Sequence, residues 1–431
     1  MKRLIAALPV ASLFLISGFA ESPPPDRLNQ LIDQIEPKVI EWRRHFHQFP
    51  ELSNREFKTA EKIAEALRSL GLEPQTGIAH TGVVATLQGG RPGPVVALRA
   101  DMDGLPVTER VDLPFASRET GEYDGQEVGV MHACGHDTHV AILLGVASVL
   151  SEVKEELQGT VKFIFQPAEE GAPEGEEGGA ELMIREGVLK NPDVDVIFGL
   201  HISSRADVGT IEYRAEGIMA AADRFRIRVK GKQTHGSTPW TGADPIVAAA
   251  HIVSGLQTIV SRQTDLTIAP AVVTVGIIRG GVRNNIIPEE VEMVGTIRTL
   301  DEAMQTKIHK QIAKVASSIA ESMGTTAEVS IFRGYPVTYN DPDLTLRMLP
   351  SLQRAAGERN VVQIAPIMGA EDFSFFQREV PGLYFFLGGK PLDVPVSEAA
   401  PHHTPDFYID ESGLKLGVEA LLNLTIDYMQ K

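Results

Sequence analysis

The chain has 431 residues, a formal net charge of −17 and a single cysteine. One hydrophobic core rarely serves a chain of this length, so we expect two domains. The negative charge would repel nucleic acid and anionic membrane surfaces, which argues against both as partners. It does not exclude a small anionic substrate, because a local cationic pocket would be enough to hold one.

The first 20 residues have the pattern of a secretory signal peptide. A basic start precedes an apolar run over residues 4–16, and small residues, Gly18 and Ala20, end the segment. The run is too short for a comfortable membrane span, and no later segment is a candidate. An uncut N-terminal anchor is the alternative, whereas a lipoprotein would need cysteine where Glu21 stands. We expect a signal peptide over 1–20 and an exported mature chain without a membrane span, with the periplasm as the favoured compartment.

Cys134 is the only cysteine of the chain. An exported protein with one cysteine cannot form an internal disulfide bond. A free thiol is a liability in an oxidising compartment unless it is buried or bound to another group. Cys134 therefore requires a specific explanation, and its sequence neighbours supply one.

Residues 21–213 alternate between strand-like and helical segments. Apolar runs predict strands over 95–100, 160–166 and 194–200, and an amphipathic pattern predicts a helix over 138–153. Strands that alternate with helices are typical of an α/β layer structure with a mostly parallel sheet.

The pattern changes over residues 214–333. Apolar and charged residues alternate over 225–230, as in an antiparallel strand with one solvated face. The remaining expected elements of this unit are strands 272–278, 291–297 and 327–332 and helices 245–261 and 302–322. Two helices on a four-stranded sheet form a compact α+β unit. Because residues 334–431 return to helix and buried strand, we expect one α/β domain (21–213 and 334–431) interrupted by an inserted α+β domain (214–333).

Metal-capable side chains follow the predicted strands at their C-terminal ends, the edge where open α/β sheets bind ligands. Asp101 and Asp103 follow the first strand, although a capped turn would also explain this pair. Glu169 and Glu170 follow the second strand; adjacent carboxylates favour a nearby cation, and one can bind it while the other, with a raised pKa, transfers a proton. His201 ends the third strand.

The densest cluster lies over residues 132–139, with three histidines, one cysteine and one aspartate. Cys134 and His136 are two positions apart, so both can face one point where the chain is extended. Thiolate and imidazole together suit zinc or another divalent transition ion. A buried free cysteine beside a helix-capping Asp137 is the alternative. His402 and His403 in the last loop add further candidate ligands.

In these motifs the chain resembles the metallopeptidase-type family of N-acyl-amino-acid amidohydrolases, which includes hippurate hydrolases, indole-acetyl-amino-acid hydrolases and related aminoacylases and carboxypeptidases. The resemblance covers nearly all of the mature chain. It rests on residues 98–106, 131–139, 165–171, 199–201, 235–237, 285–288, 368–373 and 403–405.

The resemblance implies hydrolysis of the amide bond of acetyl-, benzoyl- or similar N-acyl amino acids to a carboxylate and a free amino acid. The reaction would use a water molecule activated by two divalent ions, which could be zinc, manganese or cobalt. An exported dipeptidase or carboxypeptidase with the same metal centre is the alternative. A protein that only binds metal or amino acids is a rival from another class, but it would not need Glu169 beside Glu170.

The resemblance also implies roles for individual residues. The implied metal ligands are Cys134, His136, Glu170, His201 and His403, with Cys134 bridging two ions. Glu169 is then the general base. Asp101 and Asp103 stand where many relatives have a His-x-Asp motif. We therefore expect Asp103 to orient ligands and count Asp101 as a further supporting residue whose role stays open. His402 keeps the identity of the last ligand ambiguous, although the spacing to Pro405 favours His403.

The inserted domain corresponds to the dimerisation or lid domain of the family, which implies a homodimer. By this resemblance His235 stabilises the oxyanion, often in the active site of the partner subunit, and Asn285 contacts the substrate or the oxyanion. Gly236 and Ser237 replace an Ala-Ala pair that is frequent in the family, which puts the shape of the pocket near the acyl group in doubt.

Three further residues are candidate substrate contacts. Charge alone suggests Arg298 or Arg283 of the inserted domain as the group that holds a substrate carboxylate. Glu371 could line the substrate pocket, and a purely structural role explains it equally well.

Overall fold

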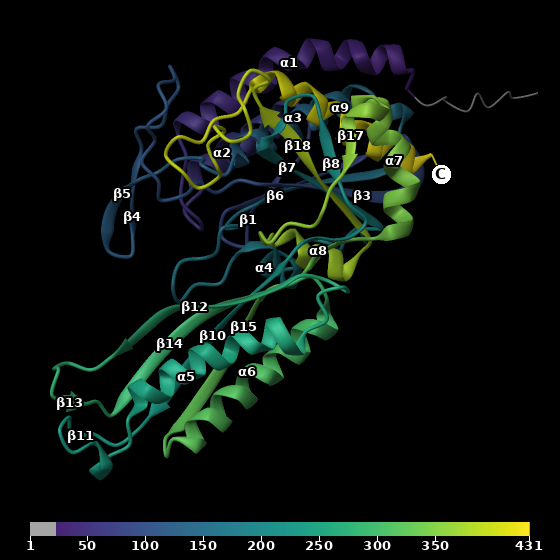
Figure 1. Cartoon of the computed structure of the whole chain (residues 1–431). Helices are drawn as coiled ribbons and strands as arrows, with labels where there is room; N and C mark the ends of the chain where they lie inside the picture. The colour runs from purple at the N-terminus through teal and green to yellow at the C-terminus, as the bar shows by residue number, and fades with distance from the viewer. Residues whose placement is uncertain (1–22, 431) are drawn as a thin grey trace, which may run out of the picture.

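The computed structural model describes residues 23–430, so the expected signal peptide over 1–20 lies outside the described residues. Figure 1 shows an α/β part built around an eight-stranded sheet and an elongated part built on a four-stranded sheet. The α/β class with a mostly parallel sheet and an inserted α+β unit is therefore confirmed. Within the described residues, no helix has both the length and the apolar character that a membrane crossing requires.

The large sheet has the strand order β1-β2-β6-β3-β7-β18-β8-β17. The bounds of its strands are β1 Gln75–Ile78, β2 Gly82–Gln88, β3 Arg91–Asp101, β6 Gln158–Gln166, β7 Val196–Asp207, β8 Ile211–Tyr213, β17 Val361–Gln363 and β18 Gly382–Lys390. The central strands β6, β3, β7 and β18 run parallel, whereas β1 and β2 are antiparallel additions at one edge. The parallel centre brings the C-terminal ends of these strands to one edge of the sheet.

Helices cover both faces of this sheet. One face carries the long helices α1 (Pro25–Gln48), α2 (Phe57–Ser69), α3 (His136–Glu152), α7 (Pro342–Ala356) and α9 (Leu414–Met429). The other face carries the short helices α4 (Gly179–Arg185) and α8 (Phe373–Glu379). Because every strand of the parallel centre is covered on both sides, its residues are apolar nearly throughout.

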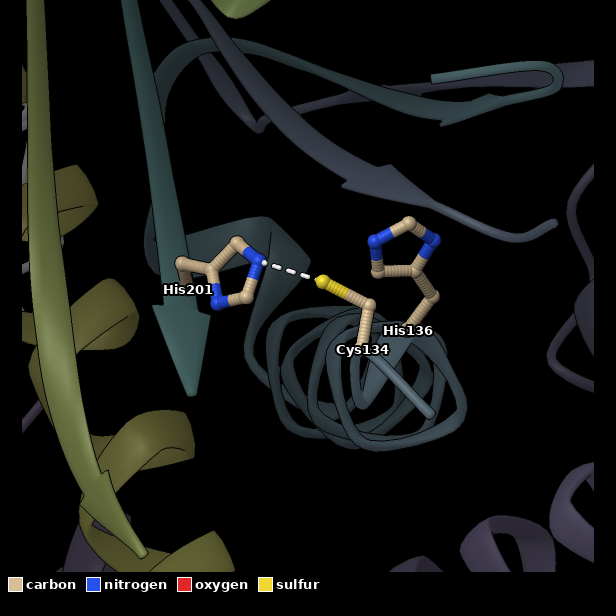
Figure 2. Close-up of side chains that lie close together, drawn as sticks. All are labelled: Cys134, His136 and His201. Atoms are coloured by element: carbon tan, nitrogen blue, oxygen red, sulfur yellow. Dashed lines mark hydrogen bonds between the residues drawn. The ribbon is translucent and has the colours of Figure 1, made fainter. Parts of the chain in front are cut away.

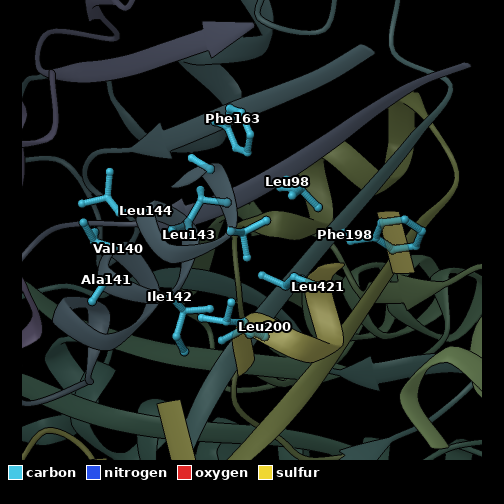
Figure 3. Packing of buried hydrophobic residues seen from close by; sticks show 14 of the residues in the cluster. Leu98, Val140, Ala141, Ile142, Leu143, Leu144, Phe163, Phe198, Leu200 and Leu421 are labelled. Atoms are coloured by element: carbon cyan, nitrogen blue, oxygen red, sulfur yellow. The ribbon is translucent and has the colours of Figure 1, made fainter. Parts of the chain in front are cut away.

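Helix α3 is the centre of the first face. All of its side chains from His136 to Leu150 are buried, and Figure 3 shows Ile142, Leu143 and Leu144 among apolar side chains of the strands and α9. A helix that is apolar all round is buried on every side. Its first residue, His136, is thereby fixed at the edge of the sheet.

The inserted part contains a four-stranded antiparallel sheet of order β12-β14-β10-β15. Its strands are β10 Ala221–Lys230, β12 Ala271–Gly280, β14 Glu290–Thr299 and β15 Thr326–Tyr335, and its long helices are α5 Pro245–Thr258 and α6 Glu302–Ser322. Each helix begins at an aspartate, Asp244 or Asp301, whose carboxylate accepts backbone N–H bonds of the first turn. The expected domain limits 214–333 stay a prediction, because the short pair β9 (Glu216–Met219) and β16 (Thr338–Asn340) joins the two parts across them.

Two further small sheets have two strands each. The pair β4 (Thr120–Tyr123) and β5 (Gln126–Gly129) projects from the α/β part, and the pair β11 (Thr234–His235) and β13 (Ile286–Ile287) lies at the far tip of the inserted part.

Candidate active site

Cys134 lies at the centre of the candidate site, on the turn that leads into α3. Its Sγ is 3.4 Å from Nε2 of His201 and 3.3 Å from Nε2 of His403. Figure 2 shows the thiol between the imidazole of His201, which projects from β7, and that of His136. Ligand atoms of Cys134, His136 and His201 lie within 4.8 Å of one another, and so do those of Cys134, Glu170 and His403. The one thiol therefore belongs to two candidate metal positions.

The turn that carries Cys134 requires glycine at its next position. Gly135 has φ +93°, and a Cβ atom there would lie 2.3 Å from Cγ2 of Ile202. Both the left-handed backbone and the close approach of β7 exclude a larger residue. This turn aims Cys134 and His136 at the same region.

Asp103 organises the cluster without taking part in either metal group. Its carboxylate accepts hydrogen bonds from the backbone N–H groups of Glu169 and Glu170, at 3.1 and 3.0 Å, and from the hydroxyl of Ser53 at 2.7 Å. Nδ1 of His136 lies 2.9 Å from the carbonyl oxygen of Asp103 and 3.2 Å from its carboxylate. The structure thus places Asp103 behind the ligands, where it fixes both the imidazole and the glutamate loop.

The histidine rings present Nε2 to the cluster because their Nδ1 atoms are occupied. Nδ1–H of His201 donates to the carbonyl oxygen of Ile202 at 2.6 Å, as Nδ1–H of His136 donates to Asp103. A ligand histidine commonly has its second nitrogen fixed in this way. Nε2 of His136 is buried and has no hydrogen-bond partner among the described residues.

His402 and His403 occupy different positions although they are neighbours in sequence. Nε2 of His403 lies 3.1 Å from Oε1 of Glu170, within the second metal group. His402 instead contacts backbone through both nitrogens, the carbonyl of Cys134 at 3.1 Å and the N–H of Ser204 at 3.2 Å. The geometry favours His403 as the ligand and gives His402 a supporting role.

Asp101 is fully buried and bound on both oxygens. Arg99 donates to one oxygen at 2.7 Å, and Nδ1–H of His139 donates to the other at 2.5 Å. Burial alone would raise the pKa of Asp101, but Arg99 and the neighbouring histidines outweigh it and hold the pKa well below its usual range. His139 in turn accepts the backbone N–H of Ile202 at 2.8 Å, next to His201. Asp101 therefore acts as a charged support beneath the site.

Glu169 is the buried carboxyl group beside the metal groups. Ala168, which precedes it, has φ +52°, an uncommon conformation for a residue with a side chain and one often found at functional sites. The hydroxyl of Tyr335 donates to the backbone carbonyl of Glu169 at 2.6 Å. Burial, together with the charges of Glu371 and Glu170, raises the pKa of Glu169 well above its usual value.

The residues at this site fit divalent cations. Nε2 of His136 is buried without a hydrogen-bond partner among the described residues, and burying such a group costs free energy unless another partner binds it. Burial and the two adjacent glutamates raise the pKa of the Cys134 thiol well above its usual value, and a cation at this point would reverse that effect. Sulfur, imidazole nitrogen and carboxylate oxygen are ligands of divalent transition ions.

A cavity of about 660 Å³ opens beside the cluster. Cys134, Glu169 and Arg298 line it, so of the predicted substrate contacts Arg298 faces the site. Glu371 also lines the cavity, but its carboxylate is already bound by Arg99 at 3.0 Å and by the hydroxyl of Tyr384 at 2.7 Å. These contacts favour the structural role for Glu371 over direct substrate binding.

Three other residues of the sequence analysis lie outside this cavity. His235 is exposed on β11, and the hydroxyl of Ser237 lies 2.7 Å from its Nδ1. Asn285 and Arg283 belong to the same tip of the inserted part, and Figure 1 shows this tip far from the large sheet. His235, which the sequence analysis expects to stabilise the oxyanion, therefore does not lie at the metal cluster of its own chain.

Several residues around the site were not found from sequence. Tyr335 ends the last strand of the inserted part, and Asp372 accepts a 2.8 Å bond from Arg99. Asp372 lies within the motif 368–373, but the sequence analysis gave it no role, and no motif marks Tyr335. Arg99 did carry a signal, because a charged residue inside an otherwise apolar central strand requires buried acidic partners.

Comparisons with known proteins agree with this geometry. Residues 97–427 match the Peptidase family M20/M25/M40. The chain is 41% identical to thermostable carboxypeptidase 1 of Saccharolobus solfataricus, over 94% of this chain and 99% of that protein. It is 40% identical to the N-acyl-L-amino acid amidohydrolase of Geobacillus stearothermophilus, over 74% of this chain and 82% of that protein.

A solved structure shows the same likeness. The YXEP protein of Bacillus subtilis, a dinuclear metal binding peptidase from the M20 family, superposes with a TM-score of 0.77 and 34% identity, over 92% of this chain and 99% of that one. The resemblance stated from the sequence is thereby confirmed. The chain belongs to the Peptidase family M20/M25/M40 and is a hydrolase.

Proposed function

We propose that this protein hydrolyses the amide bond of N-acyl amino acids, releasing a carboxylic acid and a free amino acid. One observation carries the proposal: the thiol of Cys134 lies between His201 and His403. Beside it are the buried, unpartnered Nε2 of His136, the carboxylate of Glu170 and the adjacent buried Glu169. Relatives named for N-acyl amino acid hydrolysis and N-acetylcysteine deacetylation support this substrate class.

The proposed centre holds two divalent ions, zinc, manganese or cobalt. His136 and His201 would bind one ion, Glu170 and His403 the other, and Cys134 both. Bound there, such ions would lower the pKa of a water molecule and polarise the amide carbonyl. A protein that only binds metal would need these ligands. It would not need Glu169, a buried carboxyl group that is not among the proposed ligands.

Glu169 supplies the proton transfer in this proposal. Its carboxylate takes a proton from the attacking water and returns it to the amine nitrogen that leaves. Burial and the charges of Glu371 and Glu170 raise the pKa of Glu169, which makes its carboxylate a stronger proton acceptor. Tyr335 fixes the backbone of Glu169, so the carboxyl group keeps its position during both transfers.

The surroundings of the cluster accommodate an amide with a substituent on each side. Glu170 lines both the 660 Å³ cavity and a second hollow of about 930 Å³. Arg298 in the first cavity is a cation that could hold the carboxylate of the amino acid. A carboxypeptidase or dipeptidase with the same centre stays the second candidate, because a relative at 41% identity is named a carboxypeptidase.

The first prediction concerns Glu169→Gln. This variant keeps the shape of the side chain and the metal ligands, so its metal content should equal that of the wild type. Loss of the proton acceptor should lower kcat by about 10²- to 10⁴-fold. Metal analysis and turnover of N-acetyl amino acids, with dipeptides in parallel, provide the measurement. Glu61→Gln, exposed on α2 and outside both cavities, is the control. Full activity of Glu169→Gln would refute the assignment of the base.

The second prediction separates the adjacent histidines. His403→Ala should bind one ion fewer per chain, because His403 belongs to only one metal group. His402→Ala removes two hydrogen bonds to the backbone and a ring contact with His201, but no ligand of the proposed ions. It should keep both ions, with an affinity weaker by about 10- to 100-fold at most. Metal titration of the metal-free proteins provides the test. The reverse outcome, in which His402→Ala loses an ion and His403→Ala does not, would exchange the two assignments.

We further propose a homodimer in which the inserted part of one subunit completes the active site of the other. β12 is an edge strand of its sheet. Ile278 and, beyond the strand, Val282 are 54% and 92% exposed, and Trp240 near His235 is 79% exposed. Apolar groups exposed at a strand edge favour association. His235 and Asn285 lie at this tip, so contact with a partner would place them near the partner's metal cluster.

The third prediction tests this arrangement with mixed dimers. Glu169→Gln and His235→Ala chains, co-expressed with different tags, should each form weakly active homodimers. The purified mixed dimer contains one site with both groups intact if His235 acts on the partner, so it should have about half of the wild-type activity. If His235 acted within its own chain, neither site would be intact and the mixed dimer would stay weakly active.

Export to the periplasm is also part of the proposal, supported by the basic and apolar pattern of residues 1–20. The fourth prediction is that a bacterial host removes this segment and that the exported protein begins at Glu21. Mass spectrometry of the periplasmic fraction measures the start. Ala20→Phe should block the cleavage because the peptidase requires a small residue there. An uncleaved chain in both preparations would contradict the prediction.

A further inference from the structure

A row of three side chains crosses the large sheet from the metal cluster into the cavity. His201 on β7 pairs with Phe386 on β18, and Phe386 pairs with Glu212 on β8. Residues directly paired across neighbouring strands point to the same face of a sheet. The ring centroids of His201 and Phe386 are 6.2 Å apart. Since neighbouring strands lie about 4.8 Å apart, the backbone of Glu212 is about 10 Å from that of His201.

The space between the two ends of this row has apolar walls. Phe386, Met219, Ile364 and Ile367 all line the 660 Å³ cavity. Met219 and Phe386 belong to the core on this face of the sheet, and Ile364 packs against it. Because Met219 and Phe386 are part of a packed core, this wall of the cavity keeps its position. It suits a long, unbranched, apolar group whose scissile amide lies at the metal cluster.

Glu212 is the acidic group at the far end of this row. Its side chain is half-buried, and it forms no hydrogen bond or ion pair with the residues that the structure describes. Burial, and then the charge of Asp207, raises the pKa of Glu212. Asp207 has its own cation, Lys390, at 2.6 Å. Arg205 also lines the cavity from the exposed end of β7 but forms no ion pair with Glu212. A half-buried carboxylate without a cation gains free energy when a ligand supplies one.

We infer that this cavity selects amino acids whose side chain is apolar along its length and ends in a cationic nitrogen, as in N-acyl-lysine, N-acyl-ornithine and N-acyl-arginine. Glu212 is the specificity-determining residue, and it binds the terminal nitrogen while Arg298 holds the carboxylate. This inference rests on the proposed amidohydrolase function. Acidic side chains would place a like charge against Glu212 and are excluded.

The experiment compares Nα-acetyl-lysine, which keeps its terminal ammonium group, with N-acetyl-norleucine. The norleucine side chain has the same apolar length but no ammonium group. With the metal-loaded wild-type enzyme, kcat/KM should be about tenfold or more higher for the lysine substrate, as a hydrogen bond between charged groups allows. Glu212→Gln should lower this ratio by about tenfold, mainly through KM of the lysine substrate, because the group acts in binding. N-acetyl-glutamate should be the poorest substrate of the three.

Glu419→Gln is the matched control. Glu419 is also a half-buried glutamate whose pKa burial raises, but it lies on α9 outside the cavity, so its variant should keep the wild-type ratio. If the ratio of kcat/KM for the lysine substrate to that for the norleucine substrate were the same in the wild type and in Glu212→Gln, the inference would be overturned. Hydrolysis of N-acetyl-norleucine would still leave the proposed function intact. If other N-acetyl amino acids were cleaved but neither of these two, the inference alone would fail. If none were cleaved, both would fail.

Discussion

The structure depends on one electrostatic constraint, the burial of several acidic groups around a single point. Asp101, Asp103, Glu169 and Glu371 are all buried at or beside the site. Like charges in a low-dielectric interior destabilise a fold unless cations or hydrogen-bond donors compensate them. Arg99 forms ion pairs with Asp101 and Glu371, and the backbone N–H groups of two residues donate hydrogen bonds to Asp103. Glu169 and Glu170, which face the cavity, form no ion pair with an arginine or lysine among the described residues, and divalent ions would compensate their charge.

A second layer of charge holds the helix that presents the ligands. Asp137, next to His136, forms an ion pair with Arg43 at 3.0 Å and contacts His47 at 2.9 Å, both from α1. His47 reaches Glu109 with its other nitrogen at 3.1 Å. Burial and Arg43 oppose protonation of His47, but Asp137 and Glu109 outweigh them and raise its pKa. The N-terminal helix is thus connected by charge to the start of α3, and its packing contributes to the position of the ligands.

The sequence predicted the parts of this site that are local in the chain. Short motifs at strand ends identified Cys134, His136 and Glu170, because a parallel sheet brings such ends together whatever the exact topology. Charge partners distant in sequence were not predictable: nothing in α1 marks Arg43 as the partner of Asp137. The fold class followed from hydrophobic periodicity, whereas the location of His235 at a distant tip depends on how the inserted sheet is oriented, which periodicity does not determine.

Strand register explains how one sheet edge can serve both chemistry and selection. β7 supplies His201, and the pairing of β7, β18 and β8 then fixes where Phe386 and Glu212 lie relative to it. The distance between the two ends of the row cannot change without a slip of register, which would also turn Phe386 and Tyr384 away from the core of this face. The side chain at position 212 is less constrained, because Glu212 is half-buried and is not part of that core. The buried centre of the sheet therefore fixes the position of the ligand His201, whereas the proposed selectivity for the substrate side chain depends on Glu212, on a strand near the edge of the sheet.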